Sequence, residues 1–269
     1  MIDFPGSKIN LGLRIIQRLA NGYHTLESIF VPTSFSDPEL CWSVNAMGTL
    51  NLLEAVKNYS PNTRVLYVSS SEVYGAAINP GTPHKETTRL APGNPYAASK
   101  AATDLMAQQY ARNGLNVIVA RPFNHAGPGQ LSSFALPAFA RQIALIERGE
   151  QEAVISVGNL DVERDFLDVR DVVSAYAMLV ASSDIEPGCV FNICSGRPRN
   201  LKQILVRLIE LSGTDVDINV DPEKFRVSDS PSVFGDNSRL SLMTGWRPTI
   251  DWDETLRDIL DYARDSVAV

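Results

Sequence analysis

The sequence has 269 residues, 44% of them hydrophobic and 20% charged, a balance typical of a globular protein with one large α/β domain or a core and a small lobe. Its formal net charge of -7 argues against nucleic acid as a partner, and no apolar run approaches the roughly 20 residues that cross a bilayer. Polar residues interrupt the first apolar stretch, so no signal peptide is predicted, and three cysteines without metal spacing favour buried thiols, no metal site and a cytoplasmic location.

The first 60 residues contain two different patterns. Residues 1–33 read as two short amphipathic stretches joined by a turn at Asn21-Gly22. From Pro38 to Tyr59 the apolar spacing is helical, with Asp37 as the expected N-cap. The core contacts expected from this helix are Trp42, Met47, Leu50, Leu53 and Val56.

Two continuous apolar runs follow, RVLYVSS at 64–70 and NVIVARP at 116–122, and a helix is predicted between them over about 96–113. Such runs are typical of strands that are buried on both faces of a parallel sheet. Strand, helix and strand in this order predict a doubly wound α/β fold, whose ligands bind beyond the carboxyl ends of the strands.

The second half of the chain alternates in the same way. Helices are predicted over 136–148, 168–183, 201–213 and 252–267, and strands over 153–158, 189–195 and 215–220. Asp168 is the expected cap of the helix that it begins, and Gly213 the end of the next one.

The pair Tyr96 and Lys100 is the strongest functional signal. A spacing of four places both side chains on one face of a helix. A neighbouring ammonium favours the phenolate, so we expect Lys100 to lower the pKa of Tyr96. A tyrosine tuned in this way can exchange a proton during redox chemistry at an alcohol or ketone carbon. Ser70, Ser71 and Glu72 follow the preceding strand and are expected at the same edge of the sheet.

The runs SSSEVYG, NPYAASK, RPFNHAGPGQ, VGNLDVERDFLDVRDVVSAY, NICSGRP and GWRPTIDWDETL together resemble the extended short-chain dehydrogenase/reductase superfamily from about Ser34 onward. The greatest likeness is to its NAD-dependent epimerase/dehydratase members that act on GDP-sugars, the GDP-4-keto-6-deoxy-mannose reductases. The resemblance implies a Rossmann-like sheet with a smaller C-terminal α/β lobe for the substrate. It also implies an NADP- or NAD-dependent reductase of a nucleotide-activated 4-keto-6-deoxy sugar.

The resemblance assigns roles to individual residues. Tyr96 matches the proton donor and Lys100 the lysine that holds the nicotinamide ribose. Ser70 matches the residue that binds the substrate oxygen, and Glu72 the acid of the 4,6-dehydratases. The other cofactor-binding candidates are Ser69, Pro122, Asn124 and His125, and the substrate-binding candidates are Ser71, Asn124, Arg164 and Arg226.

The sequence departs from this superfamily at its beginning. It has no glycine-rich turn of the TGxxGxxG type, so the expected sheet lacks its usual N-terminal strands and their pyrophosphate-binding loop. Residues 1–33 instead resemble the start of the 4-diphosphocytidyl-methylerythritol kinases, in which Lys8, Tyr23 and His24 would match site residues. The expected division is a foreign hairpin at 1–33, a partial dinucleotide-binding domain at 34–130, and a substrate lobe at 131–269 whose elements at about 166–195 return to the sheet.

Several functions therefore stay open. Besides the reductase, the residues are consistent with a GDP-sugar 4,6-dehydratase or epimerase, because Glu72 occurs in both kinds of site. Loss of the pyrophosphate loop would leave a non-catalytic sugar-nucleotide-binding module, and a remnant kinase is the remaining alternative. A homodimer through the helices at about 38–57 and 96–113 is expected by analogy with the superfamily.

Overall fold

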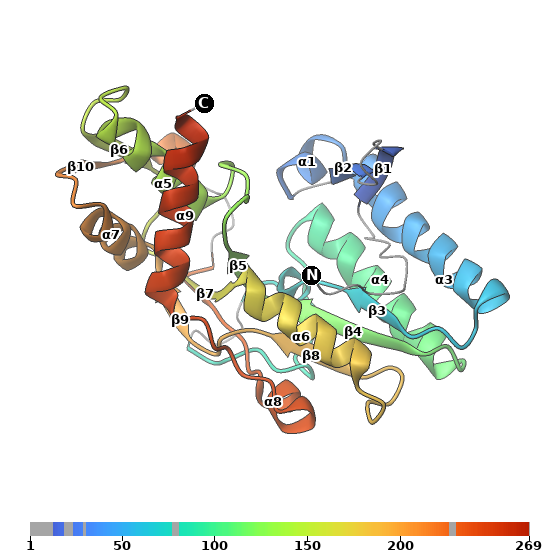
Figure 1. Cartoon of the computed structure of the whole chain (residues 1–269). Coiled ribbons are helices and arrows are strands. Elements are labelled where there is room, and N and C mark those ends of the chain that lie inside the picture. Colours follow the sequence, from blue (N-terminus) through green and yellow to red (C-terminus); the bar gives the residue numbers. More distant parts are fainter. Residues whose placement is uncertain (1–12, 19–23, 29–30, 77–80, 226–229, 269) are drawn as a thin grey trace. The chain divides into compact units, whose positions relative to one another are not determined.

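The computed structural model describes residues 13–18, 24–28, 31–76, 81–225 and 230–268, and up to residue 33 it describes the backbone alone. The chain divides into two compact units (Figure 1). Unit 1 comprises Met1–Gly75, Leu90–Ala120 and Asp184–Val190, and unit 2 comprises Ala76–Arg89, Arg121–Ser183 and Phe191–Val269. The expected turn at Asn21-Gly22 and the candidates Lys8, Tyr23 and Arg226 lie outside the described residues.

Unit 1 begins with the expected pair of N-terminal stretches. Strand β1 (Leu13–Arg18) pairs antiparallel with β2 (His24–Ser28), and Leu13 lies opposite Ser28. A short helix, α1 (Val31–Ser36), follows.

The helical stretch after Asp37 is continuous but contains one wide turn. It consists of α2 (Pro38–Trp42), the π-helical turn η1 (Ser43–Met47) and α3 (Gly48–Tyr59), and Asp37 caps it as expected. The π turn stretches the spacing of the inward face to four residues, so the buried side chains are Cys41, Asn45, Thr49 and Leu53. The prediction that Trp42 and Met47 belong to the core is therefore wrong; they are 41% and 52% exposed.

A parallel sheet forms the centre of the doubly wound fold. Strand β3 (Val65–Val68) pairs in parallel with β4 (Val117–Pro122), whose other neighbour is β8 (Val190–Ile193). Helix α4 (Pro95–Arg112) connects β3 to β4 and, with α3, packs on this strand pair (Figure 1). The fold class is confirmed, and β3 has no second partner among the described strands, as expected for a sheet without its N-terminal strands. Its residues other than Tyr67 are only partly buried, whereas all of β4 is buried.

Unit 2 is built around β7 (Glu163–Asp168). It pairs in parallel with β5 (Asn124–Ala126) and β11 (Ser232–Val233), and antiparallel with β9 (Pro198–Asn200). A separate parallel pair joins β6 (Val154–Val157) to β10 (Asp217–Val220). The helices are α5 (Ala135–Glu147), α6 (Val169–Ala181), α7 (Leu201–Ser212), α8 (Ser238–Thr244) and α9 (Trp252–Val267), with a 3₁₀ turn, η3, at Pro222–Lys224.

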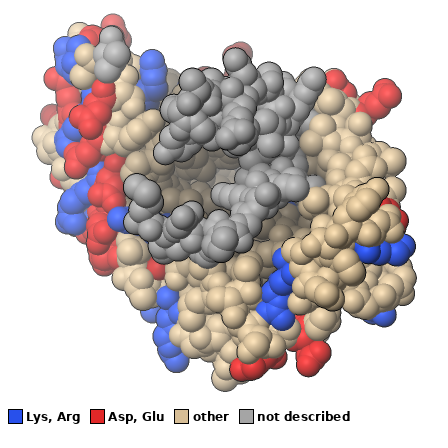
Figure 2. Space-filling model, turned by 45° about the vertical axis from the view of Figure 1, so that its right-hand side comes forward, with Lys and Arg blue, Asp and Glu red and all other residues tan. Residues whose placement is uncertain are grey.

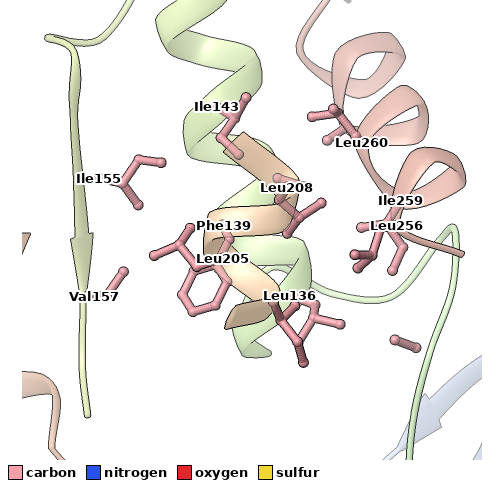
Figure 3. Packing of buried hydrophobic residues seen from close by; sticks show 14 of the residues in the cluster. Leu136, Phe139, Ile143, Ile155, Val157, Leu205, Leu208, Leu256, Ile259 and Leu260 are labelled. Carbon is pink, nitrogen blue, oxygen red and sulfur yellow. The ribbon is translucent and has the colours of Figure 1, made fainter. Parts of the chain in front are cut away.

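The core of unit 2 lies between α5, α7, α9 and β6. Figure 3 shows Phe139 and Ile143 of α5 facing Leu205 and Leu208 of α7, with the leucines of α9 beyond them. Asp168 caps α6 and Gly213 ends α7 in a left-handed conformation, so both predicted helix boundaries are confirmed.

Two buried anchors hold the loops of unit 2. The carboxylate of Asp165 accepts hydrogen bonds from the backbone N–H groups of Ser195, Gly196 and Gly235, at 2.7, 3.0 and 3.2 Å. The indole of Trp246 is buried and donates to the carbonyl of Asp171 at 3.2 Å. These bonds satisfy polar groups that would otherwise be costly to bury.

The visible surface carries both signs of charge side by side (Figure 2). In unit 2, Arg264 bonds Glu147 and Asp261, and Arg170 bonds Asp168, Glu254 and Asp258. None of the described helices is long and apolar enough to cross a membrane.

Candidate active site

The serine-rich end of β3 forms the first wall of the candidate site. The ladder continues one residue past the strand, because Ser69 N–H donates to the carbonyl of Ala120 at 2.7 Å. The side chain of Ser70 then caps the 3₁₀ turn η2 (Ser71–Tyr74) by accepting from Glu72 N–H at 3.2 Å. The local sequence thus ends the strand and places three hydroxyls and one carboxylate at its carboxyl end.

Helix α4 supplies the second wall. Asn94 caps it by accepting from Ala97 N–H at 2.7 Å, and Pro95 occupies its first turn. The amide of Asn94 also donates to the carboxylate of Glu72 at 3.2 Å. This bond ties η2 to the beginning of α4, where Tyr96 lies.

The Tyr96 phenol meets the Ser70 side chain, as the sequence predicted. Burial raises the pKa of this phenol to about 12, the hydrogen bond with Ser70 acts in the opposite direction, and the electrostatic effects of Glu72 and Cys41 raise it further. The prediction that the Tyr96 pKa is lowered is therefore wrong for the chain alone. Lys100 is not among the groups that shift it, and burial dominates.

The Lys100 ammonium points instead to the strand. It is 6% exposed, donates to the carbonyl of Val68 at 2.6 Å and lies 5.1 Å from the ring centroid of Tyr67. Burial lowers the pKa of Lys100 to about 8, while the electrostatic effects of the Asp104 carboxylate and, less strongly, of the Cys41 side chain act in the opposite direction. The ammonium is held at the end of β3 by this bond, and it is not among the groups that change the Tyr96 pKa.

A buried polar layer behind α4 was missed in the sequence analysis. Asn45, in the π turn, donates to the hydroxyl of Ser99 at 2.9 Å, and Ser99 lies between Tyr96 and Lys100 on α4. The Tyr67 hydroxyl bonds that of Thr103 one turn further on. A polar side chain on the inward face of an apolar helix could have signalled this contact, but its partner depends on the π turn.

The remaining predicted site residues that the structure describes belong to unit 2. Pro122 is buried at the end of β4, Asn124 is exposed on β5, and the ring of His125 contacts the carbonyl of Phe123 at 3.0 Å. Arg164, on β7, donates to the carbonyls of Glu163 and Ser230 at 2.8 and 2.7 Å. Both of these Arg164 bonds are to backbone, and its expected role toward a diphosphate stays a prediction.

The residues present fit one end of a nicotinamide dinucleotide. The hydroxyl of Ser69 is buried and has no hydrogen-bond partner among the described residues, and it follows Val68, whose carbonyl binds Lys100. An unsatisfied buried hydroxyl next in the chain to the lysine's acceptor suits the polar nicotinamide ribose. For the pyrophosphate end, the sequence offers no glycine-rich turn.

A serine, a tyrosine and a lysine at the carboxyl end of a parallel strand define the site class of the short-chain dehydrogenases/reductases. Comparison with known proteins narrows this class. The model of the GDP-mannose 4,6-dehydratase family matches residues 23–259, and the chain belongs to this family. The match begins before Ser34, where the resemblance was expected to start.

Relatives and solved structures agree with the family. The chain is 40% identical over 238 residues to the GDP-6-deoxy-D-mannose reductase of Pseudomonas aeruginosa, covering 88% of this chain and 78% of that relative. A structure of RMD from Pseudomonas aeruginosa complexed with NADPH is 39% identical with a TM-score of 0.83, covering 88% and 78% of the two chains. A dTDP-glucose 4,6-dehydratase from Bacillus anthracis in complex with NAD is 26% identical with a TM-score of 0.74, covering 84% and 70%.

Proposed function

We propose that this chain is an NADP(H)-dependent reductase of a GDP-bound 4-keto-6-deoxy sugar. The observation that carries the proposal is the hydrogen bond between Ser70 and Tyr96 at the end of β3, with Lys100 one turn along α4. The 40% identity to a GDP-6-deoxy-D-mannose reductase and the likeness to an NADPH complex support the choice of sugar nucleotide and cofactor.

Tyr96 is the proton donor in this proposal. With a pKa of about 12 its phenol is fully protonated at neutral pH and therefore holds the proton that the reduced carbonyl oxygen requires. Ser70 accepts or donates at the same oxygen and orients it. Lys100 holds the nicotinamide ribose and, once drawn away from Val68, adds positive charge beside Tyr96. The bound dinucleotide supplies the hydride.

The other candidates bind and orient. Ser69, Pro122, Asn124 and His125 are proposed to line the nicotinamide end. Ser71, Asn124, Arg164 and Arg226 are proposed to bind the sugar nucleotide, since the planar guanidinium of arginine suits phosphate oxygens.

The test is oxidation of NADPH by the purified chain in the presence of GDP-4-keto-6-deoxy-D-mannose. We expect turnover by the wild-type chain. In Tyr96→Phe we expect at least about a hundredfold loss of turnover, because phenylalanine lacks only the hydroxyl group that donates the proton. Tyr59→Phe, at an 88% exposed tyrosine of the same unit, is the matched control and should retain activity. A folded chain without any NADPH oxidation would reject the reductase.

Two observations favour alternatives that the same preparation can distinguish. Glu72 is tied to the start of α4 at 3.2 Å, a position suited to the acid of a 4,6-dehydratase. Conversion of GDP-mannose to its 4-keto product would support that activity. The sequence without a glycine-rich turn favours a non-catalytic module, which calorimetry would recognise as GDP binding without NADPH binding.

A cytoplasmic homodimer completes the proposal. Helices α2 and α4 and the turn η1 pack together in unit 1, and their outward side chains include Leu40, Met47 and Leu105, which are 45%, 52% and 54% exposed. Apolar side chains on adjoining helices are typical of an interface between copies.

A further inference from the structure

Helix α4 contains a second buried charge besides Lys100. Asp104 is 0% exposed and follows Lys100 by four residues, so the two side chains lie on one face one turn apart. A buried carboxylate and a buried ammonium are each costly unless compensated. The burial of two opposite charges one turn apart therefore suggests that each compensates the other.

We propose that Asp104 is a positioning residue, the buried counter-charge that keeps the Lys100 ammonium protonated and in place at the end of β3. Its importance for the reaction rests on the proposed reductase function, in which Lys100 holds the nicotinamide ribose. Its effect on Lys100 does not depend on any ligand.

The surroundings of Lys100 single out Asp104. Strand β3 presents the Val68 carbonyl at 2.6 Å and the ring of Tyr67 at 5.1 Å, and both are uncharged. Helix α2 presents the thiol of Cys41, which is 0% exposed, and α4 itself presents Asp104. Tyr96 lies one turn before Lys100 on α4 and is uncharged at neutral pH. Among these groups the carboxylate is the one ordinarily ionised at neutral pH.

The electrostatics agree with the geometry. Burial alone disfavours the ammonium, and the charge of Asp104 is the largest effect that opposes it, so that the pKa of Lys100 stands at about 8. Without the carboxylate, Lys100 would lose its proton at a lower pH, and a larger fraction of it would be neutral under physiological conditions.

The carboxylate is itself held in place. The amide of Gln108, one turn further along α4, donates to Asp104 at 2.6 Å. The preceding residue, Thr103, bonds the Tyr67 hydroxyl and accordingly fixes the ring beneath Lys100. Asp104 thus has a defined orientation on the face that it shares with the lysine.

The test measures the charge of Lys100 directly. In chain labelled with ¹³C-lysine, the side-chain resonance of Lys100 is assigned by its absence from Lys100→Met and followed against pH. We expect Asp104→Asn to lower the midpoint by about one pH unit or more, a tenfold change, and Asp104→Glu to leave it nearly unchanged. Asp261→Asn, at a 66% exposed carboxylate of α9, is the control and should not move it.

Superimposable titrations of wild type and Asp104→Asn would overturn the proposal. If Asp104→Asn does not fold, the double variant Asp104→Asn with Lys100→Met decides, since removing both charges should restore what removing one loses. Failure of the double variant to fold would make Asp104 a folding residue and reject the positioning role. In an active preparation the alkaline fall of kcat/KM should begin at lower pH in Asp104→Asn.

Discussion

At the scale of single residues, Lys100 couples the site to the stability of the chain. Its pKa is about 8 in the folded chain, against 10.5 for an unperturbed lysine. Between these values the unfolded chain binds a proton that the folded chain does not, so the free energy of unfolding should rise with pH. The slope expected from one such group is roughly 1 kcal/mol per pH unit.

Urea denaturation at about pH 7.5, 8.5 and 9.5 would measure this rise in the free energy of unfolding. Lys100→Met should abolish it, because methionine does not titrate. Lys57→Met, at a lysine whose side chain is 58% exposed, is the control and should keep it. An equal rise in Lys100→Met and wild type would show that another group is responsible.

The sequence predicted that Ser70 and Tyr96 lie close together, but it did not predict which group the Lys100 ammonium contacts. The spacing of Tyr96 and Lys100 and the serine-rich end of a strand predicted a common edge, and Ser70 does bond Tyr96. The lysine donates to Val68 because a buried ammonium must find an acceptor, and the one that it finds is a carbonyl of another element. Such an acceptor is set by tertiary packing and leaves no mark on the local pattern.

At the scale of elements, the turn that follows η2 requires glycine. Gly75 has a φ of 69°, and a Cβ added there would lie 1.9 Å from the carbonyl oxygen of Ala91. Alanine at this position must move backbone that Ala91 N–H anchors to the carbonyl of Val73 at 3.0 Å. We expect Gly75→Ala to destabilise the chain by roughly 3 kcal/mol.

Thermal unfolding of Gly75→Ala beside Gly48→Ala would check this. Gly48 lies in α3, and a Cβ there meets nothing within 4 Å. Alanine at Gly48 should therefore stabilise the helix by roughly 0.5–1 kcal/mol. Equal melting temperatures for the two variants would contradict the steric account of the turn.

The predicted helices are found, and so are the strands β3, β4, β6, β8 and β10, whereas β5, β7, β9 and β11 were not predicted. Each predicted helix from 38–59 to 252–267 is found, because periodic apolar spacing over several turns is a strong signal. Strand β7 was missed because Glu163, Arg164 and Asp165 interrupt its apolar pattern. Asp165 can be buried there only because the loops at Ser195 and Gly235 bond it, and those partners are 30 and 70 residues away in the sequence.

At the scale of the whole molecule, the outward face of α2, η1 and α4 predicts association. Leu105→Glu should dissociate the proposed homodimer, because it places a charge among apolar side chains. Sedimentation velocity of wild type and variant at several concentrations would measure the change. Leu242→Glu, at an 86% exposed leucine of α8, is the control and should sediment as wild type. Wild type that sediments as a monomer at every concentration would reject the dimer.

The burial of Trp246 makes the chain its own optical probe. It and Trp252 belong to unit 2, whereas Trp42, the remaining one of the three tryptophans, is 41% exposed in unit 1. An indole taken out of water emits at shorter wavelength than a hydrated one, so in Trp42→Phe the emission of the protein reports the melting of unit 2 alone. Comparing that signal with circular dichroism of the whole chain would reveal whether the Tyr96-bearing unit comes apart first, last or together with its neighbour.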